Sequence, residues 1–303
     1  VQRELSISYG KLGDIALVEG DLKWARDAFE QSHKIRLNIF DVDSYNVVAR
    51  RDLSVSYFKL GDIDLSEGDL KGARKAFEKA IEIDKCLADA DFQNFHAQRD
   101  LSISYDRLGE VAMAEGDLKA AGEAYEKSHE ISIRLAEAEP RNLHAQRDLS
   151  FSYERLGEVA MAESDLKAAG EAYRKSLEIS QRLAKATTSA QAQQDLSCQY
   201  NNLAWYHLHD KNFPLADEFA RKAIARSHDS IFQANLAHAL LFQGKYAEAE
   251  KIHVQHKGTK VDGQTWEHWV AEDFRKLRKA GIVHPDMKMV ESLLGIAGGL
   301  PKE

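Results

Sequence analysis

The sequence predicts an all-α protein, a right-handed solenoid of six helix pairs with a helical cap at its C-terminal end. Three observations support this fold class. A four-residue motif, Arg-Asp-Leu-Ser or a close variant, recurs every 48 residues from Arg3, and a fixed period of this kind is typical of repeat proteins. Within each repeat, apolar residues fall at steps of three and four, which is the spacing of an amphipathic helix. A Gly-Asp or Ser-Asp pair interrupts each apolar run midway, so each repeat divides into two helices.

Residues 1–186 are expected to form four long repeats of about 48 residues each. Their motifs begin at four equivalent positions: Arg3, Arg51, Arg99 and Arg147. In the third repeat, Leu101 and Tyr105 begin the apolar stripe of the first helix. Gly116 can adopt the positive φ of a helix end, and Asp117 can cap the helix that follows. Each long repeat is therefore a first helix, a short turn and a second helix.

Residues 187–257 are expected to form two shorter repeats. Their equivalent leucines, Leu203 and Leu236, are 33 residues apart, close to the period of about 34 of the shorter helix-pair repeats. Residues 258–303 are expected to supply capping helices over Gly263–Ala280 and His284–Leu294, followed by a tail. A solenoid needs such a cap to cover its last apolar face. Because no similar cap precedes Val1, we expect further chain upstream in the natural protein.

The long repeats share a signature of an aromatic residue, Leu and Gly on the first helix, then Ala and an aromatic residue on the second. The signature residues are Tyr9/Leu12/Gly13/Ala25/Phe29, Tyr57/Leu60/Gly61/Ala73/Phe77, Tyr105/Leu108/Gly109/Ala121/Tyr125 and Tyr153/Leu156/Gly157/Ala169/Tyr173. This pattern resembles that of tetratricopeptide repeats. The length of the repeats is similar to that in kinesin light chain and in bacterial multidomain proteins. The resemblance implies a protein-binding repeat domain whose small residues let the two helices of a pair approach closely.

Composition excludes several classes of protein. The chain is 44% hydrophobic and 30% charged, with a mean hydropathy of -0.48, and it has no apolar run of the roughly 18 to 20 residues that a membrane helix needs. The net charge of -8 lies entirely in the first 187 residues, which argues against binding to nucleic acid or anionic lipid and permits a basic partner. The two cysteines, Cys86 and Cys198, match no disulfide or metal spacing, so we expect a cytoplasmic protein.

No catalytic, metal or cofactor site is predicted, so we expect a protein that is not an enzyme. Cys198 and His207 are nine residues apart on one helix, which separates them by about 13 Å along the axis. His253 and His256 share a helical face, but a zinc site needs a third protein ligand. The basic run over residues 275–279 is short and is expected to be a solvated helix surface.

The side of each first helix opposite the Leu-Gly signature carries the candidate functional residues. In proteins that resemble this one, that side lines the concave groove in which peptide ligands lie. Stacking would place a basic row, an apolar row and two acidic rows along the groove, as at a protein-binding surface. The candidate residues are Arg51, Phe58, Asp62, Arg99, Ile103, Asp106, Glu110, Arg147, Phe151, Glu154, Glu158, Asn201 and Trp205.

The leading hypothesis is a scaffold whose acidic groove holds a basic and apolar segment of another protein or of a neighbouring domain of the same chain. Mutual repulsion among the acidic residues would favour a cationic guest. A structural alternative is that Arg99 and its equivalents pair with acidic residues of the next repeat, and that Ile103 packs between repeats. Two further functions stay open: a regulatory or sensor arm of a bacterial enzyme, such as a caspase-like protease, nucleotidase (NTPase) or kinase, and self-assembly through the N-terminal end.

Overall fold

The chain folds into helices that follow one another in pairs, as the repeats predict. The structure, a computed structural model, describes residues 1–187, 189–227, 230–261 and 263–296. The helices of this part are α1 (Gln2–Glu19), α2 (Leu22–Val42), α3 (Val47–Glu67), α4 (Leu70–Ala90), α5 (Phe95–Glu115), α6 (Leu118–Ala138), α7 (Leu143–Ala162), α8 (Leu166–Ala186), α9 (Ala190–His209), α10 (Phe213–Ile224), α11 (Ile231–Phe242), α12 (Tyr246–His256), α13 (Trp266–Lys279) and α14 (Met287–Leu294). A two-residue antiparallel strand pair, β1 (Lys260–Val261) and β2 (Gln264–Thr265), precedes α13.

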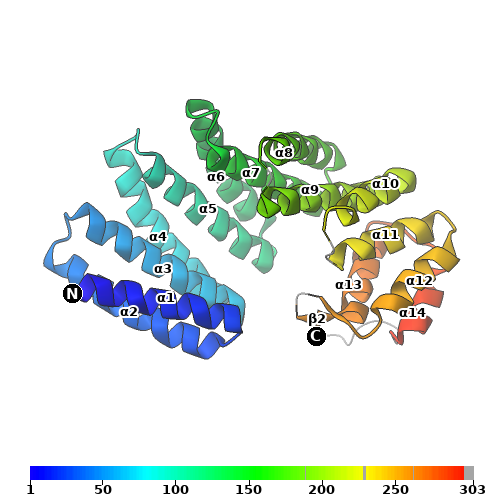
Figure 1. Cartoon of the computed structure of the whole chain (residues 1–303), viewed down its shortest axis with the longest axis horizontal. Coiled ribbons are helices and arrows are strands. Elements are labelled where there is room, and N and C mark those ends of the chain that lie inside the picture. Colours follow the sequence, from blue (N-terminus) through cyan, green and yellow to red (C-terminus); the bar gives the residue numbers. More distant parts are fainter. Residues whose placement is uncertain (188, 228–229, 262, 297–303) are drawn as a thin grey trace. The chain divides into compact units, whose positions relative to one another are not determined.

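The chain divides into two compact units, residues 1–159 and 160–303, and the division falls inside α7. Within the first unit, each helix from α1 to α5 packs against the helix that follows it (Figure 1). In the second unit, α8 to α12 pack in the same consecutive manner. The fold is therefore an all-α solenoid of helix pairs. The predicted limits at residues 186 and 257 lie at helix ends, after α8 and α12.

The turn inside each long repeat has the predicted chemistry. Asp21, Asp69, Asp117 and Asp165 each precede a second helix, and each side chain accepts a hydrogen bond from the backbone N–H three residues later, at 2.9–3.0 Å. The residues before them, Gly20, Gly68, Gly116 and Ser164, all have positive φ between 66° and 81°. Glycine adopts this left-handed conformation without a steric cost, so the sequence pair Gly-Asp ends one helix and starts the next.

The glycine of each Leu-Gly signature marks the closest contact between the paired helices. A Cβ atom placed on Gly61 would lie 2.7 Å from an aromatic carbon of Phe77, and one placed on Gly13 would lie 2.5 Å from Phe29. Gly109 faces Tyr125 in the same way. Both aromatic side chains of the first two repeats are almost fully buried. The predicted interface of glycine against an aromatic ring is confirmed.

The C-terminal cap is helical, with shorter helices than the sequence predicts. Gly263 has a φ of 79° and turns the strand pair, so α13 begins at Trp266, where the Thr265 hydroxyl accepts a hydrogen bond from the His268 backbone N–H at 3.3 Å. The second predicted helix begins at Met287 instead of His284. Apolar residues of both helices share one core with α9 to α12. Residues 297–303 of the predicted tail lie outside the described residues.

None of the helices in the described part of the chain is both long enough and apolar enough to cross a bilayer. The apolar residues of the long helices form stripes that pack against neighbouring helices, and the remaining faces carry charged side chains.

Candidate functional site

Three hollows lie between consecutive first helices of the N-terminal unit, each with a second helix as its floor. The first, between α1 and α3, has a volume of about 160 Å³. The second, between α3 and α5, has a volume of about 630 Å³ and adjoins a smaller hollow of about 130 Å³ further along the same helices. The third, between α5 and α7, has a volume of about 340 Å³. These are called the α1/α3, α3/α5 and α5/α7 hollows below.

Seven of the thirteen predicted residues line these hollows. Those in the α3/α5 hollow and the smaller hollow beside it, or in the α5/α7 hollow, are Arg51, Phe58, Arg99, Ile103, Asp106, Arg147 and Phe151. The other acidic residues of the prediction, Asp62, Glu110, Glu154 and Glu158, are not among the lining side chains. The face that the sequence singled out is therefore hollowed, but its acidic residues lie mainly beside the hollows.

The predicted arginine row forms ion pairs between successive repeats, as the structural alternative expects. Arg3, Arg51 and Arg99 each contact the aspartate that follows the equivalent arginine of the next repeat. The Nε–Oδ2 distances are 2.5 Å for Arg3–Asp52, 2.9 Å for Arg51–Asp100 and 2.5 Å for Arg99–Asp148. We call these pairs the arginine ladder. Because they are partly exposed, each is expected to contribute up to about 1 kcal/mol.

The acidic rows are neutralised inside the protein, which corrects the prediction that they repel one another. Arg107 Nε lies 3.3 Å from Asp62 Oδ1, and its Nη1 donates to Glu110 at 2.6 Å. Arg155 contacts Asp106, Glu110 and Glu158, the last at 3.0 Å. Arg107 and Arg155 thus supply the positive charge that the prediction assigned to a bound protein segment.

The sequence contains a signal for these cations that lies outside the predicted set. Basic residues recur every 48 positions along the first helices, at Lys11, Lys59, Arg107 and Arg155. Each of the last three reaches back to an acid of the preceding repeat, and Lys59 Nζ lies 2.7 Å from Asp14 Oδ1. These basic positions lie on a neighbouring side of each first helix, so a prediction that follows one helical face does not include them.

Burial raises the pKa of several carboxyl groups beside the hollows. The pKa of Glu158 rises to about 7 and that of Asp106 to about 6, because loss of water disfavours their charged forms. The Arg155 guanidinium opposes both shifts without cancelling them. The pKa of Asp62 is also raised by burial. Both pKa values therefore lie closer to neutral pH than that of an exposed carboxyl group.

Two aromatic side chains of the apolar row pack against other residues. Phe58 packs edge-on against Phe77 with ring centroids 5.7 Å apart, and the Arg147 guanidinium lies over the Phe151 ring at 4.7 Å. The more exposed apolar residues are valines of α3 that do not belong to the predicted row. Val47 and Val48 are 63% and 50% exposed and line the α3/α5 hollow. Their position in the first turn after the Asn46 cap is the sequence feature that could have indicated them.

The lining charge differs from one hollow to the next. The α1/α3 hollow has the basic Lys11, Arg36 and Lys59 against Asp14. The α3/α5 hollow has the acidic Asp52, Asp84, Asp91 and Asp100 against Arg3 and Arg51. The α5/α7 hollow has the basic Arg99, Arg107, Arg147 and Arg155 against Asp106 and Asp148. The lining is acidic only in the middle of these three hollows, whereas the prediction placed acidic side chains along the whole groove.

Two predicted residues belong to the C-terminal unit and make internal contacts there. Asn201 Oδ1 accepts a hydrogen bond from Asn235 Nδ2 at 2.8 Å. The Trp205 ring packs edge-on against His209, with centroids 4.6 Å apart, and lies against the core of this unit. These contacts give both side chains a role in packing.

The C-terminal unit packs the two histidines that share a predicted helical face against Trp266. His253 accepts a hydrogen bond from Trp266 Nε1 at 3.2 Å, and His256 stacks on the same ring at 4.8 Å. His238 lies 3.1 Å from Asp273. Among the side chains described by the structure, no group of three or more His, Cys, Asp or Glu residues could hold a metal ion.

Consecutive helix pairs with a glycine-aromatic interface define an α-solenoid of the helix-pair class. The family model for the tetratricopeptide repeat matches residues 54–85 and 152–182, in the second and fourth repeats. These segments of the chain are therefore tetratricopeptide repeats. A comparison with curated proteins finds no match.

Solved structures of other proteins share the fold at low sequence identity. BtubC (BKLC) from P. vanneervenii is 16% identical, with a TM-score of 0.59 over 87% of this chain and 94% of that chain. A Rap protein complexed with Competence and Sporulation Factor is 12% identical, with a TM-score of 0.59 over 95% and 75% of the two chains. A signal transduction ATPase with a tetratricopeptide repeat sensor from Pyrococcus horikoshii is 15% identical, with a TM-score of 0.56 over 98% of this chain and 39% of that chain.

Proposed function

We propose that the chain is a non-enzymatic interaction scaffold that holds an apolar and basic segment of a protein in the hollows between its first helices. The α3/α5 hollow carries this proposal. It combines exposed Val47 and Val48 with a lining in which aspartates outnumber arginines. Apolar area bordered by charge is typical of protein-binding surfaces. A basic side chain of the segment would enter this hollow, and its apolar neighbours would cover the valines.

Two further observations support the scaffold. Tetratricopeptide repeats are generally modules for protein interaction, and the similar Rap structure is a complex with Competence and Sporulation Factor. The segment belongs to another protein or to a neighbouring domain of the same chain. We place the scaffold in the cytoplasm, on the grounds that the spacing of its two cysteines matches no disulfide or metal motif and that its described residues include no membrane-spanning helix.

The test is a selection of twelve-residue peptides from a display library on the immobilised protein, followed by affinity measurements on the synthetic peptides. Val48→Arg places a cation at the α3/α5 hollow, and we expect it to weaken binding by about ten-fold, or 1.4 kcal/mol. The matched control is Val18→Arg, because Val18 is 90% exposed and lies outside the hollows. Equal affinity of both variants for the selected peptides, or a selection that yields no binding peptide, would contradict the proposal.

A sensor arm of a larger enzyme is the second candidate function. The structural likeness to a signal transduction ATPase with a tetratricopeptide repeat sensor favours it, since that likeness extends over 98% of this chain and 39% of that chain. The sequence of the natural gene on both sides of these residues decides between the candidates. An enzyme domain encoded in the same chain favours the sensor arm, and its absence favours the independent scaffold.

A further inference from the structure

The three hollows share one plan but differ in the side chain at the floor. Equivalent positions of the second helices, 48 residues apart, place Arg36 in the α1/α3 hollow, Asp84 in the α3/α5 hollow and Ser132 in the α5/α7 hollow. Arg36 is 7% exposed, Asp84 is 3% exposed and Ser132 is 2% exposed. A cation, an anion and a neutral hydroxyl therefore occupy the same structural position in successive repeats.

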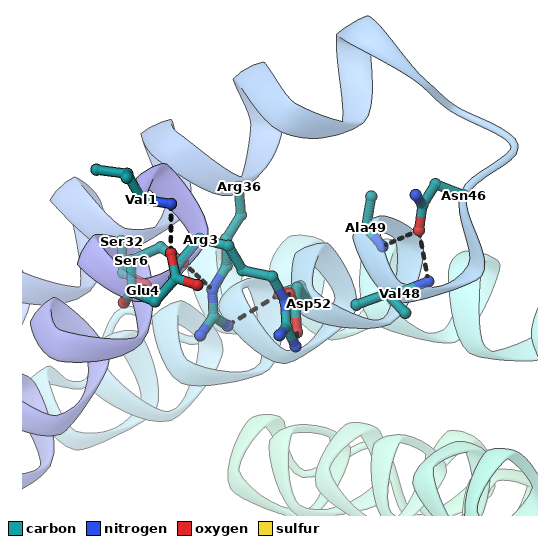
Figure 2. Close-up of polar contacts among 10 residues, drawn as sticks. All are labelled: Val1, Arg3, Glu4, Ser6, Ser32, Arg36, Asn46, Val48, Ala49 and Asp52. Carbon is teal, nitrogen blue, oxygen red and sulfur yellow. Dashed lines mark hydrogen bonds and ion pairs between the residues drawn. The ribbon is translucent and has the colours of Figure 1, made fainter.

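Arg36 is a buried cation that lacks a carboxylate partner. Figure 2 shows its guanidinium between α1 and α3, where Nη1 donates to the backbone carbonyl oxygen of Asp52 at 2.9 Å and Nε donates to Ser6 Oγ at 3.5 Å. The Asp52 carboxylate is paired with Arg3. In the described part of the chain, no carboxylate forms an ion pair with Arg36. Burial lowers its pKa, because loss of water disfavours the charged form.

Asp84 is a buried anion that, like Arg36, has no ion-pair partner of opposite charge among the described residues. Its Oδ1 accepts a hydrogen bond from Ser54 Oγ at 2.5 Å, and its Oδ2 accepts one from Ser104 Oγ at 2.7 Å. The nearby Arg51 is paired with Asp100. No cation among the described residues forms an ion pair with Asp84, and burial raises its pKa. A carboxylate has about four acceptor sites, so two hydroxyl donors leave capacity for a further donor.

The two side chains lie in adjoining hollows. Val55 of α3 lines both the α1/α3 and the α3/α5 hollow, so α3 alone separates them. A helix with its side chains is roughly 10 Å wide, and an extended chain covers that distance in about three residues. Burying a charge is costly unless an opposite charge pairs with it. A ligand that supplies both opposite charges at this spacing would offset both costs.

We propose that the α1/α3 and α3/α5 hollows together bind an extended protein segment with an acidic side chain at Arg36 and a basic side chain at Asp84, about three residues apart. This inference rests on the proposed function and adds the charge pattern of the segment. The positive charges of Lys11 and Lys59 in the α1/α3 hollow also favour an acidic side chain there. The negative charge of Asp91 in the α3/α5 hollow favours a basic one. Electrostatic complementarity of this kind sets specificity and orientation more than total affinity.

The experiment uses capped nine-residue peptides with a background of alternating Ala and Leu. One set carries one Glu and one Arg separated by two, three or four positions, in both orders, and matched sets carry two Glu, two Arg or neither. Fluorescence anisotropy measures their affinity for the intact chain. We expect the best mixed peptide to bind at least about ten-fold more tightly than every matched peptide. Equal binding of the two-Arg peptide would overturn the inference.

Two variants assign each charge to its hollow. Asp84→Ser and Arg36→Ser copy the serine that the third hollow already accommodates at this position. Asp84→Ser should abolish the preference for Arg and keep that for Glu, and Arg36→Ser should do the reverse. The matched controls, Asp89→Ser on α4 and Lys34→Ser on α2, remove charges of the same sign that lie outside the hollows. Unchanged preferences in the first two variants would overturn the inference.

The outcomes also separate this inference from the proposed function. If the selected peptides lose affinity for the Val48→Arg variant but show no need for both charges, the scaffold stands and the charge pattern is wrong. If no peptide from either set binds the intact chain, the scaffold itself is wrong. The comparison among peptides on the unaltered protein needs no variant, so a poorly folding substitution does not weaken the test.

Discussion

Single residues decide how closely the helices of a pair approach. At Gly109 any side chain would overlap the Tyr125 ring, which is 1% exposed and has no room to move. We expect Gly109→Leu to lower the free energy of unfolding by about 1 to 3 kcal/mol or more, the usual cost of overpacking. The control is Lys119→Ala, because the Lys119 side chain is 87% exposed. Thermal unfolding followed by circular dichroism measures both, and equal midpoints would show that this contact does not limit the packing.

The turn at Ser164 is a second place where a single residue is expected to affect stability. Ser164 has a φ of 66°, in the left-handed region that a residue with a Cβ adopts at a cost, whereas the equivalent Gly116 has a φ of 77°. We expect Ser164→Gly to raise stability by about 1 kcal/mol and Gly116→Ser to lower it by a similar amount. Urea unfolding of the two variants checks this, and a loss of stability in Ser164→Gly would disprove the argument.

The interface between α5 and α7 depends on one cation and three carboxylates. Arg155 contacts Asp106, Glu110 and Glu158. Removing it in Arg155→Met leaves these acids without their cation, so the raised pKa values of Asp106 and Glu158 should rise further. The variant's loss of stability should therefore be larger at pH 8, where they are charged, than at pH 5.5, where the folded protein binds protons.

Thermal unfolding of Arg155→Met and the intact chain at both pH values measures this difference. Arg141→Met is the control, since Arg141 lies exposed in the turn before α7. A loss of stability that is the same at both pH values would mean that packing of the arginine stem, and not its charge, supports the interface.

The cap helices make the C-terminal unit sensitive to acid. Burial lowers the pKa of His253 to about 3, with His238 and His256 adding to the shift, while an exposed histidine titrates near 6.5. Between these values the unfolded chain binds the proton and the folded chain does not. The stability that neutral His253 supports is therefore complete above about pH 6.5 and falls with decreasing pH, by up to about 1.4 kcal/mol per pH unit.

His253→Gln tests this effect, because glutamine can still accept the hydrogen bond from Trp266 Nε1 but does not titrate. We expect the stability difference between the variant and the intact chain to shift in favour of the variant from pH 7.5 to pH 5. Near-ultraviolet circular dichroism of the tryptophans during thermal unfolding gives the measurement. Parallel pH profiles for the two proteins would exclude His253 as the cause.

At the scale of the whole molecule, stability should be a sum of contacts between neighbouring helix pairs. The cap residues Trp266, Phe274 and Leu277 share a core with α11, which is buried along most of its length. Ending the chain after Lys257 should therefore remove amide protection from α11 and α12 and leave α3 to α6 unchanged. Hydrogen exchange measures both regions in one experiment. Equal loss of protection in α3 to α6 would show that the chain unfolds as one cooperative unit.

The sequence by itself determined the elements of this protein. The 48-residue period, the Gly-Asp turns and the glycine-aromatic signature predict the helices, their pairing and their closest contact, because each depends on neighbouring residues along the chain. Hollows and ion pairs depend on which side chains meet between repeats. The sequence indicated a face on which hollows lie, but it could not show that Arg107 and Arg155 reach back to the acids of the preceding repeat.

The tertiary structure alone decided which charges are left without a partner. Arg36, Asp84 and Ser132 follow the same 48-residue period as the other repeat residues. The repeat pattern therefore does not single them out. Stacking buries all three at the floors of adjacent hollows and gives most of the surrounding charges partners of their own. The physical reason is that the distances between helices determine which charged side chains lose water and which are paired. The spacing of residues along one helix carries no information on those distances.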